Sequence, residues 1–137
     1  MASDEPTTLP TSDEQWRVRL SPAEFRVLRQ GATEPAFTGE YVDTKTAGTY
    51  ECRACGARLY NSTDKFDSHC GWPSFDDAIP GAIKEIDDLS HGMVRTEIRC
   101  ANCDSHLGHV FRGEMMTAKD TRHCVNSISI KLDPAGA

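Results

Sequence analysis

Four of the six cysteines form two Cys-x-x-Cys pairs, a spacing that points to metal binding. Each pair is a tight turn that can direct two thiolates at one ion, and two such turns complete the tetrahedral four-sulfur site that zinc prefers. Residues 56–99 lie between the pairs, a longer stretch than the roughly 15 to 20 residues of an ordinary zinc ribbon. A four-thiolate site has no open position for substrate, so we predict one structural zinc per chain. Its ligands are Cys52, Cys55, Cys100 and Cys103.

Two other interpretations of these pairs are open. A thioredoxin-like redox pair is less favoured, because such a pair opens a helix in a βαβ setting. The second pair here follows an alternating strand and precedes Gly108. Four unliganded thiols are the remaining alternative, and the matched spacing of the two turns favours the metal over it.

Removing the four paired cysteines leaves Cys70 and Cys124. Cys124 has Arg122 and His123 as neighbours, and cationic groups favour the thiolate, which is the nucleophilic form. A small buried hydrophobic residue in a strand is an equally supported interpretation of this stretch alone. Strand alternation places Arg122 and Asn126 on the same face as Cys124, and we expect that face to be turned toward the core.

Cys70 and two histidines lie in other distinctive segments. Gly71 and Pro73 flank Trp72, which predicts a compact loop holding a rigid aromatic wall, although a plain core anchor is the more common role of tryptophan. Gly108 permits a bend or bulge that could bring the rings of His106 and His109 to one pocket as proton donors. From these residues alone, surface or hydrogen-bonded histidines are the favoured interpretation.

The elements that must position these residues are a short helix and a series of strands. The 137 residues predict one domain over 15–134, with tails at 1–14 and 135–137. Ser21 and Glu24 form a capping box with Pro22 at the first helical position, so we expect a helix to about Gln30 that stops at Gly31. Alternation predicts strands over 94–100, 109–111 and 124–132.

Composition excludes several classes of partner. The net charge of −6 and the isoelectric point of about 5.3 provide no basic surface for nucleic acid or anionic lipid. No apolar run is long enough to span a membrane, and the N-terminus lacks the features of a signal peptide. We therefore expect a cytoplasmic protein, and a monomer, in which a framework of disulfides is disfavoured.

Several motifs together resemble the methionine-R-sulfoxide reductases of the B type. In order, they are Cys-x-x-Cys, His-Cys-Gly-Trp-Pro-Ser-Phe, Cys-x-x-Cys, His-Leu-Gly-His-Val-Phe and Arg-His-Cys-Val-Asn-Ser. The resemblance runs from about Leu20 to Leu132. It implies a mainly β fold of two packed antiparallel sheets with short N-terminal helices and a structural zinc. The implied activity is reduction of the R epimer of methionine sulfoxide, mainly in oxidised proteins, as repair after oxidative damage.

The resemblance also implies roles for individual residues. Cys124 matches the nucleophile and Cys70 the resolving cysteine, while His106 and His109 match the histidines that supply or position a proton. The implied course is a sulfenic acid on Cys124, then a Cys70–Cys124 disulfide that thioredoxin reduces.

Other matched positions surround the nucleophile. Trp72 and Phe111 match aromatic walls around the substrate methyl group, and Arg122 and Asn126 match positions that set the pKa and orientation of the nucleophile. This chain departs from the family pattern at His69, where glycine is usual, and at His123, where an aromatic residue is usual. The loop 113–121 also lacks the usual Gly-Pro turn.

Two rival functions use the same residues. A zinc-dependent binding module without redox activity would explain the paired cysteines and leave Cys70, Trp72 and Cys124 without a role. A general thiol oxidoreductase would use the two remaining cysteines without selecting an epimer.

Overall fold

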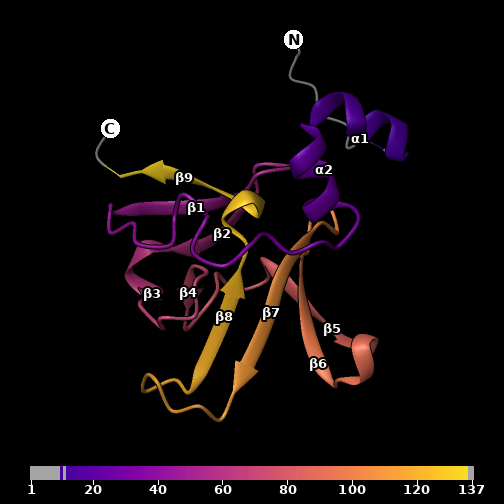
Figure 1. Cartoon of the computed structure of the whole chain (residues 1–137). Coiled ribbons are helices and arrows are strands. Elements are labelled where there is room, and N and C mark those ends of the chain that lie inside the picture. Colours follow the sequence, from indigo (N-terminus) through magenta and orange to yellow (C-terminus); the bar gives the residue numbers. More distant parts are fainter. Residues whose placement is uncertain (1–9, 11, 136–137) are drawn as a thin grey trace.

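A computed structural model describes residue 10 and residues 12–135 (Figure 1). Two short helices precede two antiparallel sheets, so the predicted mainly β class is confirmed. The helices are α1 (Asp13–Arg19) and α2 (Pro22–Leu28), with three 3-10 turns at η1 (Ser62–Asp64), η2 (Ser90–Gly92) and η3 (Ser127–Ser129). The strands are β1 (Gly48–Cys52), β2 (Arg58–Asn61), β3 (Lys65–Phe66), β4 (Ser74–Phe75), β5 (Ile83–Asp88), β6 (Arg95–Cys100), β7 (His106–Arg112), β8 (Thr121–Val125) and β9 (Ile130–Pro134).

The predicted capping box begins α2. The Ser21 hydroxyl accepts a hydrogen bond from the Glu24 backbone N–H at 3.1 Å, and the Glu24 carboxylate accepts one from the Ser21 N–H at 2.9 Å. The helix ends at Leu28, and the chain turns through Gly31 at a φ of 76°. Phe25 and Leu28 are buried, so α2 anchors the N-terminal segment to the core.

The first helix begins inside the segment that we predicted as a tail. Asp13 and Glu14 form the first turn of α1, because Ser12 caps it by accepting a hydrogen bond from the Gln15 N–H at 3.3 Å. The predicted boundary at residue 14 is therefore two residues too late. The rest of that tail, 1–9 and 11, and residues 136–137 lie outside the described part of the chain.

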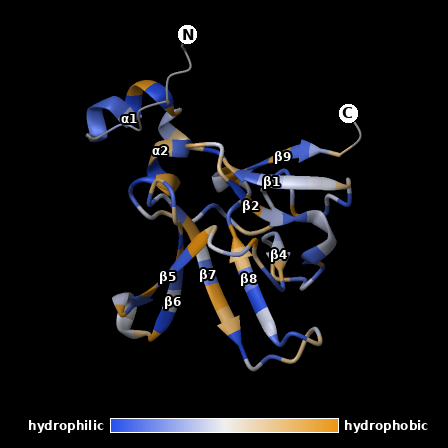
Figure 2. Cartoon of the chain, turned by 180° about the vertical axis from the view of Figure 1, so that it is seen from behind, coloured by the Kyte–Doolittle hydropathy of each residue, from blue (hydrophilic) through white to orange (hydrophobic). Residues whose placement is uncertain are grey.

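The strand order is β2-β1-β9 in the smaller sheet and β3-β4-β8-β7-β6-β5 in the larger. Figure 1 shows the long β7 and β8 side by side in the larger sheet, with the helices gathered near one end. Tyr50, Tyr60 and Phe75 are fully buried and pack ring against ring where the two sheets meet. Figure 2 shows that β7 and β8 each carry both polar and apolar residues, as expected of strands with one covered face.

The predicted strand over 124–132 is two strands in different sheets. It is interrupted at η3, after which β9 pairs with β1 instead of continuing beside β7. Within β8, His123 and Val125 are buried, whereas Cys124 is only partly so and faces a pocket on the other side. Our prediction that Cys124 faces the core was therefore wrong. Alternation separates the two faces of a strand but does not show which one the core covers.

Candidate active site and metal centre

The two Cys-x-x-Cys turns meet where the two sheets come together. All four sulfurs lie within 4.8 Å of one another, with 3.7 Å between those of Cys52 and Cys103 and 3.6 Å between those of Cys55 and Cys100. Zinc–sulfur bonds of about 2.3 Å in a tetrahedron require sulfur separations of about 3.8 Å. The cluster therefore fits a tetrahedral metal ion held by four thiolates.

This cluster joins distant parts of the chain. Cys52 ends β1 in the smaller sheet and Cys100 ends β6 in the larger. Arg29, just beyond α2, donates hydrogen bonds to the Cys103 carbonyl at 2.8 Å and to the Ser105 hydroxyl at 3.0 Å. A metal ion here cross-links both sheets, and Arg29 ties the N-terminal helices to the same point.

A separate pocket of about 190 Å³ contains the two remaining cysteines. Their sulfurs lie 3.9 Å apart, and neither cysteine is in a disulfide. The pocket brings together seven of the residues predicted for the active site: Cys70, Trp72, His109, Phe111, Arg122, Cys124 and Asn126. Thr33, Arg95 and Gly108 complete the lining and were not predicted as site residues.

The register of the larger sheet aligns Cys124 with two pocket elements. Cys124 lies opposite His109 on β7 and opposite Ser74 on β4. Gly108, next to His109, has no room for a side chain, because a Cβ there would overlap the Cys124 carbonyl. The bulge that we predicted at Gly108 is present, because Gly108 pairs with Ile98 whereas His106 pairs with Arg99, which leaves one extra residue on β7. Gly108 also allows this close approach of β7 to the nucleophile candidate.

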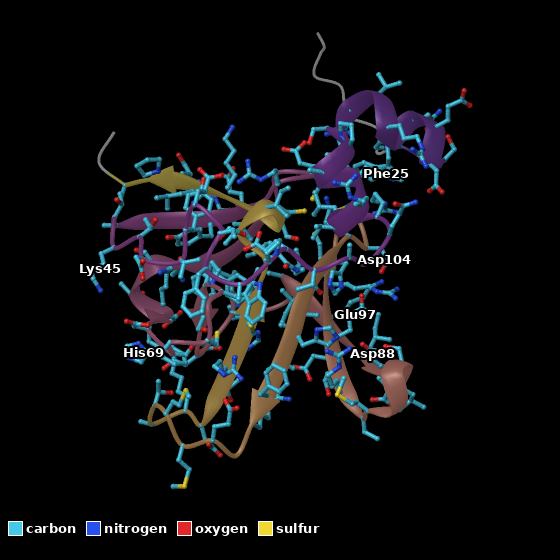
Figure 3. The ribbon with its side chains drawn as sticks, in the orientation of Figure 1. Phe25, Lys45, His69, Asp88, Glu97 and Asp104 are labelled. Carbon is cyan, nitrogen blue, oxygen red and sulfur yellow. The ribbon has the colours of Figure 1, made fainter. Side chains whose placement is uncertain are left out.

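The Cys70 loop has the compact form that its sequence predicted. Gly71 has a φ of 95°, and a Cβ there would press on Ala36 and Phe37. His69 also has a positive φ, 62°, a conformation that glycine adopts without strain. This explains why glycine suits position 69. The His69 side chain is 84% exposed and lies at the surface (Figure 3).

The two pocket sulfurs compete for one proton. The pKa of the Cys70 thiol is lowered to about 4, chiefly by the contact with Cys124 and also by hydrogen bonds with the Ser68 and Ser74 hydroxyls, while burial acts in the opposite direction. The same sulfur contact, together with burial, raises the pKa of Cys124, against which the Arg122 charge acts. At neutral pH the pair therefore carries one negative charge, held mainly on Cys70.

Arg122 is held over the pocket by two contacts. Its guanidinium forms a paired salt bridge with Glu114 at 2.8 and 3.0 Å and lies 4.6 Å from the centre of the Phe111 ring. The hydrogen bonds from Arg122 lower the pKa of the Glu114 carboxyl. The predicted proximity of Arg122 to Cys124 is thus present, with Glu114 from the 113–121 loop as an anchor that we did not predict.

The two histidines occupy different cavities. His109 lines the cysteine pocket, whereas His106 is buried and lines a neighbouring polar cavity of about 360 Å³. Their ring centres are 5.7 Å apart, and a bulge between Ile98 and Arg99 breaks the regular register next to His106. The expectation that both rings approach one pocket therefore holds for His109 alone.

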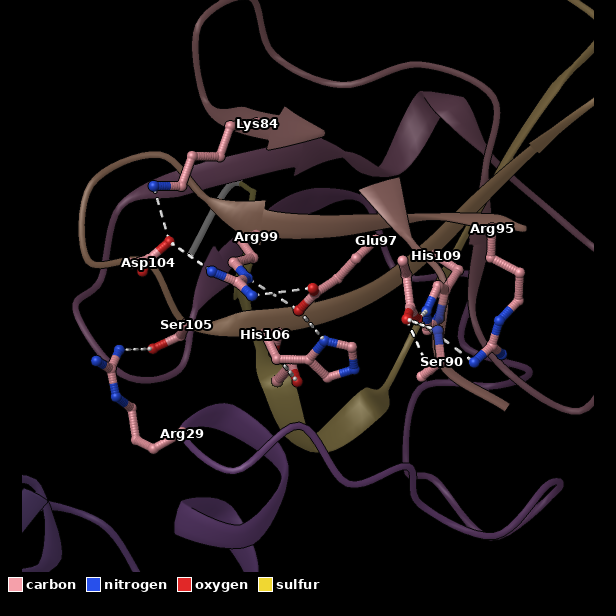
Figure 4. A network of polar contacts seen from close by, with 12 residues as sticks. Arg29, Lys84, Ser90, Arg95, Glu97, Arg99, Asp104, Ser105, His106 and His109 are labelled. Atoms are coloured by element: carbon pink, nitrogen blue, oxygen red, sulfur yellow. Dashed lines mark hydrogen bonds and ion pairs between the residues drawn. The ribbon is translucent and has the colours of Figure 1, made fainter. Parts of the chain in front are cut away.

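Each histidine has its own carboxylate, and Figure 4 shows that of His106, which is Glu97. The Nδ1 atom of His106 lies 2.8 Å from Glu97, and the Nε2 atom of His109 lies 2.8 Å from Asp88. Burial lowers the pKa of His106, and the Glu97 carboxylate only partly offsets this effect. Figure 3 shows Asp88 and Glu97 on the β5–β6 side of β7.

Asn126 and Trp72 are linked through Glu34, which sequence reasoning missed. The Asn126 side-chain oxygen accepts a hydrogen bond from the Glu34 N–H at 3.0 Å, and the Trp72 indole donates to the Glu34 carbonyl at 3.0 Å. The Glu34 carboxylate accepts the N–H groups of Ser127 and Ile128 at 2.9 and 3.0 Å. An acidic residue in a predicted loop gives no signal for such long-range contacts.

Comparison with known proteins places the chain in a family. The SelR domain family matches residues 20–134. A protein from Acinetobacter baylyi named "Peptide methionine sulfoxide reductase MsrB" is 56% identical over 123 residues, covering 88% of this chain and 87% of the relative. The Arabidopsis thaliana "Peptide methionine sulfoxide reductase B7" is also 56% identical, over 126 residues, covering 91% and 86%.

A solved structure shares the fold. The Mis18 "Yippee-like" domain superposes with a TM-score of 0.53 at 17% identity, covering 66% of this chain and 99% of that domain. At this identity the likeness concerns the fold alone. The SelR match and the identity to the curated relatives carry the assignment: the chain belongs to the SelR family of B-type methionine sulfoxide reductases.

Proposed function

We propose that this protein reduces the R epimer of methionine sulfoxide in oxidised proteins, through a sulfenic acid and a Cys70–Cys124 disulfide. The observation that carries the proposal is the pair of free sulfurs, 3.9 Å apart, in a pocket that also contains His109. The preference for the R epimer rests on family membership, and repair of oxidised proteins is the corresponding cellular role.

The pocket suits the side chain of methionine sulfoxide. Trp72 and Phe111 line it, and a methyl group bonded to sulfur gains about a kcal/mol against an aromatic face. The sulfoxide oxygen requires a proton before its sulfur becomes a good electrophile. His109 lies opposite Cys124 in the sheet and supplies that proton.

The first chemical step transfers the sulfoxide oxygen to Cys124. The Cys70 thiolate takes the proton of Cys124, which frees Cys124 as the thiolate beside Arg122. Cys124 then attacks the sulfoxide while the protonated His109 ring gives its proton to the oxygen. The sulfur–oxygen bond of the substrate breaks, methionine leaves, and Cys124 retains the hydroxyl as a sulfenic acid.

The second step uses Cys70, which is now a thiol. It condenses with the sulfenic acid to form a disulfide and releases one water. The sulfurs need to move only from 3.9 Å to the roughly 2.05 Å of a disulfide. A dithiol reductant then restores both thiols and leaves as its own disulfide, and we propose thioredoxin for this role.

The four clustered cysteines complete the proposal. Their donor set and separations fit zinc, which we assign to structure because four thiolates leave no coordination position for substrate. We propose a monomer that works in the cytoplasm, where a pool of reduced thioredoxin is available. No helix in the described part of the chain has the length and apolar character of a membrane span.

An epimer-resolved assay tests the proposal. Reduced protein is mixed with a dithiol and with the separate R and S epimers of a peptide methionine sulfoxide, and methionine is quantified. We expect turnover of the R epimer with little of the S epimer. Turnover of neither would favour a binding module built on the metal site, and turnover of unrelated disulfides without epimer preference would favour a general thiol oxidoreductase.

A further inference from the structure

Asp88 is the acidic residue that contacts His109, and each of its two carboxylate oxygens has defined partners. Its Oδ2 atom lies 2.8 Å from His109 Nε2 and 3.4 Å from an Arg95 nitrogen. Its Oδ1 atom accepts two hydrogen bonds from Ser90, from the backbone N–H at 3.0 Å and from the hydroxyl at 2.6 Å. Both carboxylate oxygens are therefore fixed, one toward Ser90 in the η2 turn and the other toward His109.

The Asp88 contact decides which ring nitrogen of His109 is available. With Nε2 bound to Asp88, Nδ1 remains, and within the described part of the chain no hydrogen-bond partner contacts it. His109 lines the pocket and lies opposite Cys124. A carboxylate that accepts from one ring nitrogen fixes the ring orientation and the proton position at the other nitrogen.

We propose that Asp88 is a positioning residue: it keeps one proton of His109 on Nε2, so that the second proton of the charged ring sits on Nδ1 and is given to the sulfoxide oxygen. The inference rests on the proposed function. When His109 gives up its Nδ1 proton, the ring is left neutral with Nε2–H still donated to Asp88. The ring therefore keeps one orientation before and after the transfer.

The neighbouring pair of Glu97 and His106 cannot take the same role as proton donor to the sulfoxide. His106 is bound through Nδ1 instead of Nε2, and its free Nε2 atom is buried without a partner. His106 is also absent from the lining of the cysteine pocket. Of these two pairs, the one formed by His109 and Asp88 has its histidine in the pocket of the reacting sulfurs.

Other charged groups near His109 must stay constant in any test. They come from the strands around it and from the Cys70 loop: Arg95, Glu97 and Arg99 on β6, His106 on β7, Arg122 and Cys124 on β8, and Cys70. Substitution at Asp88 alone removes none of these groups, and Arg95 is the one among them that loses a contact with Asp88.

The Asp88→Asn variant is the decisive change. Ser90 offers two donors to Oδ1, so the amide oxygen of asparagine is expected to face Ser90 and the amide NH₂ to face His109. An NH₂ donor opposite Nε2 removes the proton from that nitrogen and prevents the ring from carrying both protons. We expect kcat for the R sulfoxide to fall at least about a hundredfold, the range of a lost general acid, with KM changed less than about threefold.

Two controls separate this effect from damage to the fold. Asp87→Asn removes one negative charge from the preceding residue of β5, which is exposed, and we expect wild-type kcat. The reaction of Cys124 with an aromatic disulfide reagent, measured in Cys70→Ser protein, needs no proton donor. We expect Asp88→Asn to leave that rate within about twofold.

A spectroscopic readout reports the proposed cause directly. Nitrogen-15 NMR of labelled histidine is expected to show that the wild-type His109 keeps Nε2–H in its neutral ring and gains its second proton on Nδ1 as the pH falls. In Asp88→Asn we expect a neutral ring with its one proton on Nδ1. Ser90→Ala, which keeps the backbone donor to Asp88, is expected to lower kcat only a few-fold.

The outcomes distinguish two failures. If the wild type does not reduce the R sulfoxide, the proposed function is wrong. If the wild type is active and Asp88→Asn has the same kcat, or if Asp88→Asn slows the disulfide reagent as much as it slows the sulfoxide, the positioning role of Asp88 is overturned.

Discussion

The metal cluster and the cysteine pocket contain sulfurs at similar separations in very different surroundings. In the cluster, sulfurs 3.6 and 3.7 Å apart come from two tight turns, and three of the four cysteines are buried. In the pocket, sulfurs 3.9 Å apart come from one loop and one strand and share one negative charge. The number of converging thiols, and not their spacing, distinguishes the two sites in our proposal. Four thiolates close around an ion, whereas two leave room for a substrate.

Removing one ligand of the cluster should produce the largest effect. Cys100→Ser is expected to lose the metal and unfold the domain, because structural zinc contributes roughly 10 to 16 kcal/mol against a total stability of about 5 to 15 kcal/mol. Circular dichroism with metal quantification measures this. The matched control, Cys70→Ser, should keep both metal and fold, and a folded, metal-free Cys100→Ser protein would contradict the structural assignment.

Cys124→Ser should remove all sulfoxide reduction while the fold remains. A serine hydroxyl at this position cannot form the sulfenic acid or the disulfide, and the partly buried site has room for an oxygen in place of the sulfur. We expect turnover below detection and a melting temperature close to that of the wild type. Turnover of the R epimer above one tenth of the wild-type rate would contradict the role assigned to Cys124.

Cys70→Ser should separate the two chemical steps. The sulfenic acid on Cys124 would still form, because loss of the Cys70 sulfur also removes the main cause that raises the pKa of Cys124, which then loses its proton without Cys70 as a base. One equivalent of methionine is therefore expected in a single turnover without reductant. Cycling driven by thioredoxin should then be lost, because no second thiol stands beside Cys124 to form the disulfide. Mass spectrometry of the stalled protein should show one added oxygen, and equal loss of the first turnover in Cys70→Ser and Cys124→Ser would contradict the assignment.

Alkylation of Cys70 tests the shared charge. The contact with Cys124 lowers the pKa of Cys70 to about 4, so the wild-type Cys70 is a thiolate at pH 6. Cys124→Ala removes that contact, the pKa of Cys70 rises toward its ordinary value, and less thiolate is present at pH 6. We expect iodoacetamide to label Cys70 at least about tenfold more slowly in the variant. An unchanged rate would show that the two sulfurs do not share a proton.

Replacing the aromatic wall should have the smallest effect. Trp72→Leu removes the methyl–aromatic contact, worth about a kcal/mol, and should lower kcat/KM about fivefold, mainly through KM. Steady-state kinetics on a peptide sulfoxide measures this change. A loss confined to kcat would indicate that Trp72 acts on the chemical step instead of on substrate binding.

The clustering of the four paired cysteines was the most predictable feature, because these residues come in local pairs. The two-residue spacing within each Cys-x-x-Cys turn places its two thiols close together. The fold is needed only to bring the two turns to one point. The capping box of Ser21 and Glu24 was predictable for the same reason, since its partners are three residues apart. Local chemistry of this kind leaves a direct trace in the sequence.

The face of Cys124 and its polar surroundings were not predictable. Alternation identified Arg122 as sharing a face with Cys124, but the core covers the other face, that of His123 and Val125. Asp88 and Glu34 reach the site through strand register and loop contacts across long stretches of chain. An acidic residue in a loop or at the end of a strand looks the same whether it is solvated or bound to a histidine.

The pairing of β1 with β9 has a consequence for how the chain acquires this structure. Gly48 lies opposite Pro134, and the Ala135 N–H donates to the Ala47 carbonyl at 2.8 Å, so the smaller sheet joins an early strand to the last one described. During synthesis on the ribosome, the edge of β1 that pairs with β9 remains unpaired until β9 emerges. Contacts of such high sequence separation slow folding and leave an exposed edge in the interim. The nascent chain is thus open to aggregation and proteolysis at this edge until β9 is made.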